Sequence, residues 1–304
     1  MSILKFVFVL FMSCLFGVSA AYAQTSISGA GVSISTGGSY KATGNITGLT
    51  ISASHVVVDL NGFIVLGGSS VNCNTTAGTV GNSCGTSLSG VIALTITGSE
   101  VIVKNGTIMQ GNNHAVSISG STPRQDVTLV DLQISDFRGT GIVASTDGLV
   151  VRNVSIVKCG SGIFANGEVT LENVVASNNN SSGIVMGTGQ LDRVTANWNN
   201  SDGISVISAT MDHIVSNNNN GRGIVYSGVL RGGIAVGNSG DGIVANGNDA
   251  AVVDDSKSAA NGGHGFTFQT AVSDQCYFGI ATTGNSLSAI SGGTALAGSV
   301  ASCP

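Results

Sequence analysis

Residues 171–190 read LENVVASNNNSSGIVMGTGQ, and residues 191–210, LDRVTANWNNSDGISVISAT, repeat the same order of apolar, amide and glycine positions. Residues 211–230, MDHIVSNNNNGRGIVYSGVL, repeat it again. A Gly-Ile pair marks each copy, and the series contains Gly141-Ile142, Gly162-Ile163, Gly183-Ile184, Gly203-Ile204, Gly223-Ile224, Gly242-Ile243 and the related Gly265-Phe266. A fixed period near 20 residues predicts stacked structural units, each a copy of one turn of backbone.

Each unit predicts short β-strands separated by turns, because β-branched residues alternate and Gly or Asn stands at the breaks. A unit of this size cannot bury both faces alone, whereas parallel stacking about 4.8 Å apart encloses a continuous apolar core. The sequence therefore predicts an all-β fold, a single-stranded parallel β-helix. Inward positions are expected at every second residue of the Gly-Ile strand, as in Ile142 and Ala144 or Ile184 and Met186.

The amide positions predict two ladders. One contains Asn61, Asn105, Asp131, Asn153 and Asn173, and the other contains Asn179, Asn199, Asn219, Asn238 and Asn261, each four residues before its glycine. Stacked Asn side chains can hydrogen-bond to one another and to the backbone along the axis. We assign both ladders a structural role.

The chain boundaries follow from composition. A basic start, an apolar run over residues 6–18 and the site Ala21-Tyr22-Ala23 predict a signal peptide over residues 1–23. The β-helix domain is then 24–304, with caps at 24–48 and 270–304, coils over 49–269 and a loop insertion at 70–88. We expect a secreted, periplasmic or cell-surface protein with no transmembrane segment after signal removal.

Charge and cysteines narrow the choice of partners and compartment. The mature chain has 10 basic and 16 acidic residues, a net charge of 10 − 16 = −6, and no basic patch, which argues against nucleic acid. In an oxidising compartment, Cys73 and Cys84 are expected to pair, as are Cys276 and Cys303. Cys159 is left over and is expected to be a small buried apolar residue.

The segment Val57 to Ile64, VVDLNGFI, resembles the opening coil of many secreted proteins of the pectin-lyase-like superfamily. The Asn turns and Gly-Ile repeats resemble the later coils of that superfamily. The resemblance implies that the β-helix is right-handed. It leaves function open, because this fold carries lyases, glycosidases, epimerases, adhesins and tailspikes.

One candidate catalytic column lies at the residue before each glycine and contains Asp202, Arg222, Asp241 and His264. Asp or His could act there as acid or base, and Arg222 could bind a substrate carboxylate. The alternative is a solvated ladder whose alternating signs avoid repulsion.

A second column contains Glu172, Asp192 and Asp212, with Arg193 and His213 beside it as candidate substrate-binding residues. Stacked like charges are unfavourable unless a Ca²⁺ ion or basic side chains lie among them, and flanking arginines are the simpler solution. No other cofactor is expected. Trp198, the only tryptophan, could stack on a sugar ring or pack over a turn.

Between the inward positions of the Gly-Ile strand, one outward stripe is nearly apolar: Val143, Phe164, Val185, Ser205, Val225, Val244 and Thr267. A loop, a cap segment or another subunit is expected to cover it, which allows a homo-oligomer. Three functions remain: a non-catalytic or weakly catalytic protein that binds polysaccharide or a cell-surface glycan, a polysaccharide lyase, glycoside hydrolase or epimerase, and a self-associating adhesin or tailspike-like protein.

Overall fold

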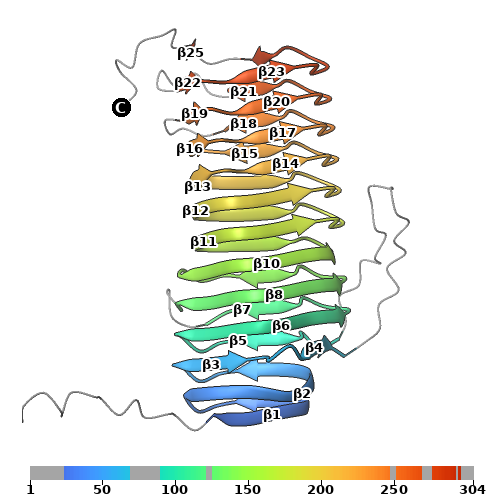
Figure 1. The fold of residues 1–304 in the computed structure, drawn as a ribbon, viewed down its shortest axis with the longest axis vertical. Helices are drawn as coiled ribbons and strands as arrows, with labels where there is room; N and C mark the ends of the chain where they lie inside the picture. The colour runs from blue at the N-terminus through green and yellow to red at the C-terminus, as the bar shows by residue number, and fades with distance from the viewer. Residues whose placement is uncertain are drawn as a thin grey trace, which may run out of the picture.

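The computed structural model describes residues 24–68, 90–120, 125–246, 251–268, 276–291 and 294–295. In these ranges all regular secondary structure is β-strand, and every strand joins one parallel sheet wound into a single column (Figure 1). The predicted all-β, right-handed parallel β-helix is confirmed. None of the described residues belongs to a helix long and apolar enough to cross a membrane.

Each coil has three faces. We call the first the Gly-Ile face, and its short strands are β5 (Leu94–Ile96), β7 (Val116–Ile118), β9 (Ile142–Ala144), β15 (Ile224–Tyr226), β18 (Ile243–Ala245), β21 (Phe266–Phe268) and β24 (Ile290–Ser291). The short strands of the next, the charged face, are β3 (Val56–Asp59), β16 (Gly228–Arg231), β19 (Val252–Asp254), β22 (Cys276–Phe278) and β25 (Thr294–Ala295). Those of the third face are β4 (Ile64–Gly67), β14 (Val215–Asn217), β17 (Ile234–Val236), β20 (Lys257–Ala259) and β23 (Ala281–Thr283).

Longer strands turn a corner and contribute to two or three faces. They are β1 (Thr25–Ile34), β2 (Gly38–Ile51), β6 (Val101–Gly111), β8 (Val127–Phe137), β10 (Leu149–Cys159), β11 (Ile163–Ser177), β12 (Ile184–Asn197) and β13 (Ile204–Asp212). In β12, for example, Ile184–Met186 lies on the Gly-Ile face, residues 189–192 on the charged face and residues 194–197 on the third face.

The 20-residue period sets the register of the sheet. Ile184 pairs with Ile204, and Ile204 pairs with Ile224, so equal positions of successive repeats lie on top of one another. All three side chains are fully buried, as the alternation predicted. The apolar core therefore runs the length of the column, enclosed by the three faces.

A ladder of buried asparagines holds the turn between the third face and the Gly-Ile face. Oδ1 of Asn199 accepts the backbone N–H of Asn179 at 3.1 Å and its side-chain amide at 2.9 Å, while Nδ2 of Asn199 donates to the carbonyl of Ala176. The same pattern links the residues Asn199, Asn219, Asn238, Asn261 and Asn285. The predicted structural ladder is confirmed, and Asn285 extends it.

The glycine of the Gly-Ile pair is required by this ladder. A Cβ added at Gly203 would lie 1.9 Å from Ser216 Oγ and 2.6 Å from Asn219 Nδ2. Only a residue without a side chain leaves room for the asparagine of the following coil. The repeated glycine and the repeated asparagine therefore satisfy the same packing requirement.

The parallel stack also includes residues that the sequence assigned to the ends. β1 pairs with β2, and β22 to β25 continue the column beyond residue 269. β3 and β6 are direct neighbours in the sheet. The predicted insertion at 70–88 and signal peptide at 1–23 lie outside the described residues.

Of the cysteines, the structure describes Cys159 fully. Its side chain is buried and unpaired, as expected, and burial raises the pKa of its thiol to about 12. Cys73, Cys84 and Cys303 lie outside the described residues, as does the side chain of Cys276. The two disulfides therefore remain predictions.

Candidate functional site

The charged face carries an open depression of about 410 Å³ across β11, β12 and β13. The outward side chains of Thr170, Gln190 and Thr210, which pair in register, line it. Five residues that the sequence predicted to bind metal or substrate also line it: Glu172, Asp192, Arg193, Asp212 and His213. The fold thus brings the predicted metal ligands together with two of the three predicted substrate-binding residues.

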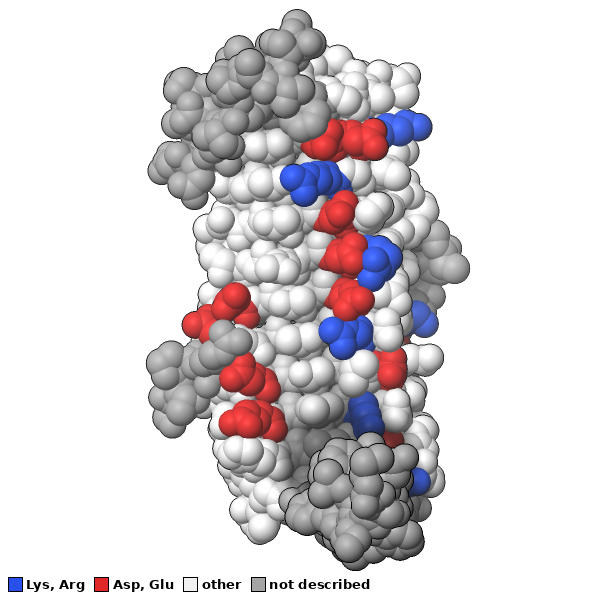
Figure 2. All heavy atoms as spheres, turned by 60° about the vertical axis from the view of Figure 1, so that its left-hand side comes forward, with Lys and Arg blue, Asp and Glu red and all other residues white. Residues whose placement is uncertain are grey.

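Strand alternation explains why these side chains point outward. Leu171, Leu191 and Met211 are buried in the core, so the residues before and after each of them face solvent. Parallel pairing then stacks equal positions into one charged column, made of Lys41, Asp59, Lys104, Val130, Arg152, Glu172, Asp192, Asp212, Arg231 and Asp254. Figure 2 shows acidic and basic side chains gathered in a column along the molecule beside a neutral surface.

The residue after this column forms the corner between the charged face and the third face, which we call the Arg193 corner. Its backbone φ is positive in coil after coil, at Asn105, Asp131, Asn153, Asn173, Arg193, His213, Gly232, Asp255 and Gly279. In the coil of Asp59 the positive φ falls one residue later, at Asn61. The left-handed conformation suits Asn, Asp and Gly, which accounts for the first predicted ladder. The side-chain amides of Asn153 and Asn173 each donate to the residue one coil before.

Arg193 and His213 depart from this rule. Their φ values are 51° and 53°, and a bulky side chain in this conformation costs roughly 1–2 kcal/mol. Both side chains are largely exposed, 54% for Arg193 and 69% for His213, so burial does not offset the strain. Strain that does not serve packing is typical of functional positions.

The arginines neutralise the stacked carboxylates. Nε of Arg152 donates to Glu172 at 2.6 Å, and Arg193 donates to Glu172 at 3.0 Å and lies 2.6 Å from Asp192. These pairs are exposed, and each contributes about 0–1 kcal/mol to stability. Flanking arginines therefore relieve part of the like-charge repulsion that the sequence implied.

A smaller cluster remains that could hold a cation. Asp192, Asp212 and His213 each offer one ligand atom, and the three atoms lie within 4.8 Å of one another. Two carboxylates and one imidazole suit Zn²⁺ or a similar ion, whereas Ca²⁺ prefers roughly six to eight oxygen ligands. Arg152 and Arg193 both pair with Glu172. The candidate cation cluster therefore contains His213 in place of the predicted Glu172.

The aspartates of the predicted catalytic column form hydrogen bonds between neighbouring coils. Oδ1 of Asp202 accepts the backbone N–H of Arg222 at 2.8 Å, and the Arg222 guanidinium holds the same carboxylate in a bidentate pair. This hydrogen bonding raises the pKa of Arg222. Asp241 accepts the backbone N–H of His264 at 2.7 Å and the hydroxyl of Thr267 at 2.8 Å.

Both aspartates thus bind the backbone N–H of the next coil, as the buried asparagines do. His264 Nδ1 lies 2.7 Å from Ser288 Oγ, so its ring is also engaged along the axis. The geometry favours the ladder interpretation of this column over the catalytic one.

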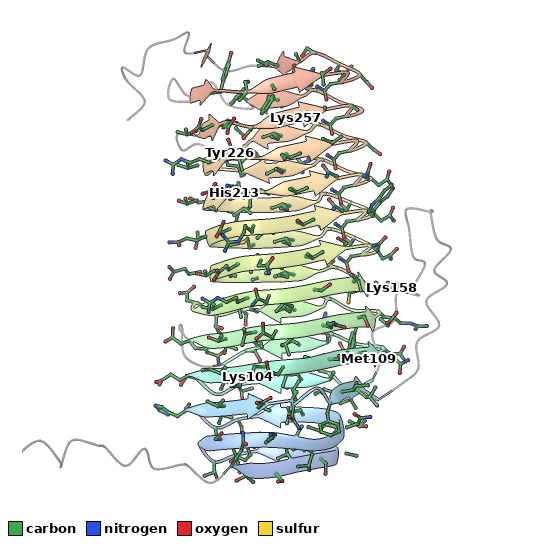
Figure 3. All side chains as sticks on the ribbon, in the orientation of Figure 1. Lys104, Met109, Lys158, His213, Tyr226 and Lys257 are labelled. Atoms are coloured by element: carbon green, nitrogen blue, oxygen red, sulfur yellow. The ribbon has the colours of Figure 1, made fainter. Side chains whose placement is uncertain are left out.

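Trp198 lies apart from the other predicted substrate-binding residues. The third face, residues 194–197, separates it from Arg193 by roughly 16 Å of strand. Figure 3 shows this separation through two labelled residues: His213 lies at the Arg193 corner, and Lys158, one of the residues stacked in the same turn as Trp198, lies on the opposite side of the column. Trp198 is therefore not part of the depression.

The outward stripe of the Gly-Ile face is only partly accessible. Phe164 is 41% exposed, whereas Val225 and Val244 are buried within the chain itself. An interface between copies, if formed here, would use the region around Phe164. The homo-oligomer remains a prediction.

Sequence reasoning missed three of the polar residues that line the depression. Thr170, Gln190 and Thr210 stand two residues before the column acids, at the other outward position of the same short strand. That spacing could have identified them, because alternate strand residues share a face. Their uncharged side chains do not by themselves indicate catalysis or metal binding.

No protein-family model matches the sequence, and no curated protein is significantly similar to it. Solved structures share its fold. The A-module of the mannuronan C-5 epimerase AlgE4 of Azotobacter vinelandii has a TM-score of 0.52 and 14% identity, with 79% of this chain and 71% of that chain covered. Pectate lyase Pel9A has a TM-score of 0.51 and 14% identity, with 79% and 70% covered.

The catalytic domain of a GH87 α-1,3-glucanase, solved with nigerose, has a TM-score of 0.57 and 11% identity. This chain is covered over 88% of its length and spans 60% of that domain. At such identities the similarity shows the fold alone, which is that of pectin-lyase-like right-handed β-helix proteins.

Proposed function

We propose that this right-handed parallel β-helix is a secreted or cell-surface protein that binds a polysaccharide on its charged face. The observation that carries the proposal is the meeting of Arg193, His213, Asp192 and Asp212 around one open depression. Arg193 and His213 have strained backbone conformations that burial of their side chains does not explain. The fold neighbours include proteins named for mannuronan, pectate and α-1,3-glucan, which supports a carbohydrate ligand.

The shape of the surface suits an extended chain. A second depression of about 120 Å³ lies on the same face and shares Thr170 with the first. It is lined by Asp126, Thr128 and Glu168 among others, so polar groups continue across the face. Hydroxyl and amide side chains both donate and accept hydrogen bonds, as sugar hydroxyls do.

The charges favour an acidic sugar. The guanidinium of Arg193 can bind a sugar carboxylate in a bidentate pair, in exchange for one of its contacts with Glu172 or Asp192. Ca²⁺ is a further part of the proposal: Asp192 and Asp212 would hold it, and it would supply positive charge for sugar carboxylates. The ligand and water would then supply most of its oxygens.

The alternative is a polysaccharide lyase, glycoside hydrolase or epimerase. It is favoured by His213 and Arg193, which stand in adjacent coils on the rim and combine a proton acceptor with a cation that can stabilise negative charge. We prefer the binding function to the enzymatic one, because the predicted catalytic carboxylates of Asp202 and Asp241 already accept hydrogen bonds from the backbone of neighbouring coils.

The test is calorimetric titration of the mature protein with polyuronates and neutral polysaccharides, with Ca²⁺ and with EDTA. Arg193→Asn and His213→Asn restore the residue found at Asn153 and Asn173, so the fold should tolerate both. We expect each to weaken binding about tenfold, or about 1.4 kcal/mol. The matched control is Lys104→Gln, which removes a positive charge from the same column but outside the depression; it should bind as the wild type does.

Absence of binding to every acidic polysaccharide would overturn the proposal. Product analysis of the same mixtures separates the two functions. New reducing ends, unsaturated products or a changed epimer ratio would establish the enzymatic alternative, whereas binding without products would establish the binding function.

A further inference from the structure

The turn between the third face and the Gly-Ile face, which we call the Trp198 corner, has a surface unlike the charged face. Residues 177–182, 197–201, 217–221 and 236–240 form this corner in successive coils and contain no charged residue. The nearest charges that follow, Asp202 and Arg222, are paired with each other. Over these four coils the corner therefore offers a neutral, amide-rich surface, which Lys158 of the preceding coil borders.

The backbone at this corner is left-handed in coil after coil, and Gln110 and Lys158 hold this conformation as well as smaller residues. Asn178, Trp198, Asn218 and Gly237 occupy one position in successive coils, with φ of 57°, 58°, 55° and 68°. Their backbone N–H groups make the same hydrogen bond to the following coil, so their geometry is equivalent. Asn and Gly adopt this left-handed conformation readily, whereas tryptophan does not.

Packing does not account for the tryptophan. Trp198 is 48% exposed, while its neighbours in the column are asparagines that meet the same backbone requirement without strain. Strain alone does not single out this position, since Lys158 shares it, but a half-exposed aromatic ring on a neutral surface points to a function outside the fold. Its indole supplies an apolar face and one N–H donor.

A row of amides lies in the same corner, two residues after Trp198 and its equivalents along the chain. Asn220 Nδ2 donates to Asn200 Oδ1 at 3.2 Å, and Ser239 Oγ donates to Asn220 Oδ1 at 3.2 Å, so the row runs along the axis. Each amide has two donors and an oxygen with two lone pairs, which leaves capacity for a ligand. The buried ladder of Asn199 and Asn219 directly beneath holds the row in place.

We infer that the Trp198 corner is a second glycan-binding surface, specific for an uncharged oligosaccharide. The indole stacks on the C–H face of one sugar, and the amides of Asn200 and Asn220 bind hydroxyls of its neighbours. The coils repeat about every 4.8 Å along the axis, which is close to the length of one pyranose unit, so a sugar chain laid along the corner meets a new coil with each residue. This site is separate from the charged face and does not depend on the function proposed for it.

Because Trp198 is the only tryptophan, its fluorescence reports directly on this corner. We expect a saturable change in emission when neutral gluco-, manno- or xylo-oligosaccharides are titrated into the mature protein. Acidic oligosaccharides should produce none through this corner. Arg193→Asn should leave the response unchanged, which distinguishes this site from the one on the charged face.

Calorimetry with the responding sugar then tests the residue itself. Trp198→Asn should weaken binding at least tenfold while its urea midpoint stays at or above that of the wild type, because asparagine fits the backbone. Trp198→Phe should retain part of the affinity. The inference is overturned if no neutral sugar changes the emission, if Trp198→Asn binds as the wild type does, or if the emission changes only with protein concentration, which would indicate contact between copies of the chain.

Discussion

Oδ1 of Asn219 accepts two hydrogen bonds from Asn199 in the preceding coil, one from the backbone N–H at 2.9 Å and one from the side-chain amide at 3.0 Å. Nδ2 of Asn219 donates in turn to the carbonyl of Ala196 and to Asn238. One buried amide thus ties three coils together. No other side chain of this size presents both a donor and an acceptor in this way.

Asn219→Ala should lower the free energy of unfolding by about 3 kcal/mol, because it leaves buried donors of Asn199 and the carbonyl of Ala196 without partners. Urea denaturation followed by circular dichroism measures the change. The control is Asn220→Ala, an exposed neighbour, which should change stability by less than about 0.5 kcal/mol. Equal effects of the two substitutions would contradict the role of the ladder.

Gly203→Ala should destabilise the protein by at least about 2 kcal/mol, since the new methyl group would overlap Ser216 Oγ and Asn219 Nδ2. Gly62→Asn is the matched control. Gly62 has a φ of 80° with open space around it, and asparagine tolerates that conformation, so the change should stay below about 1 kcal/mol. Thermal and urea unfolding of both variants provide the comparison, and a stable Gly203→Ala protein would show that the ladder can move aside.

Stability should fall in mild acid because of His114. Its Nδ1 accepts the backbone N–H of Thr140 at 2.9 Å, and burial lowers the pKa of the half-buried imidazole. The folded state then binds a proton less readily than the unfolded chain, so the contribution of His114 is fully present above the usual histidine pKa of about 6.5. It is lost as the pH falls through that value towards the lowered one.

Urea midpoints measured between about pH 7 and pH 5 check this expectation. His114→Gln should reduce the loss on acidification, because glutamine does not titrate in this range. A profile for His114→Gln that parallels the wild type would rule out His114 as the titrating group.

The buried thiol of Cys159, with its pKa raised to about 12, should not react with a thiol reagent at about pH 8 in the native protein. In denaturant without reductant, we expect Cys159 alone to react, because the other four cysteines of the mature chain are predicted to be paired. Mass spectrometry of the labelled protein counts the thiols. Five labelled cysteines would show that neither disulfide forms.

The fold was predictable because its causes are local. The Gly-Ile spacing, the alternation around residues such as Leu191 and the asparagine positions each specify which way a side chain points within a coil. A constant step of 20 residues then places Ile184, Ile204 and Ile224 in register without further information. The Arg193 corner was predictable as a turn for the same reason, since Asn153 and Asn173 recur there at the repeat spacing.

The sequence by itself determined the coil, its register and the outward column that contains Glu172, Asp192 and Asp212. Only the tertiary structure decided which residues share a site. Arg193 pairs with Glu172 from 21 residues away because one coil lies directly over the next, whereas Trp198, five residues from Arg193, lies at another corner. The direction in which the chain turns between the faces sets these distances, and it depends on the packing of whole coils around the core rather than on any one repeat.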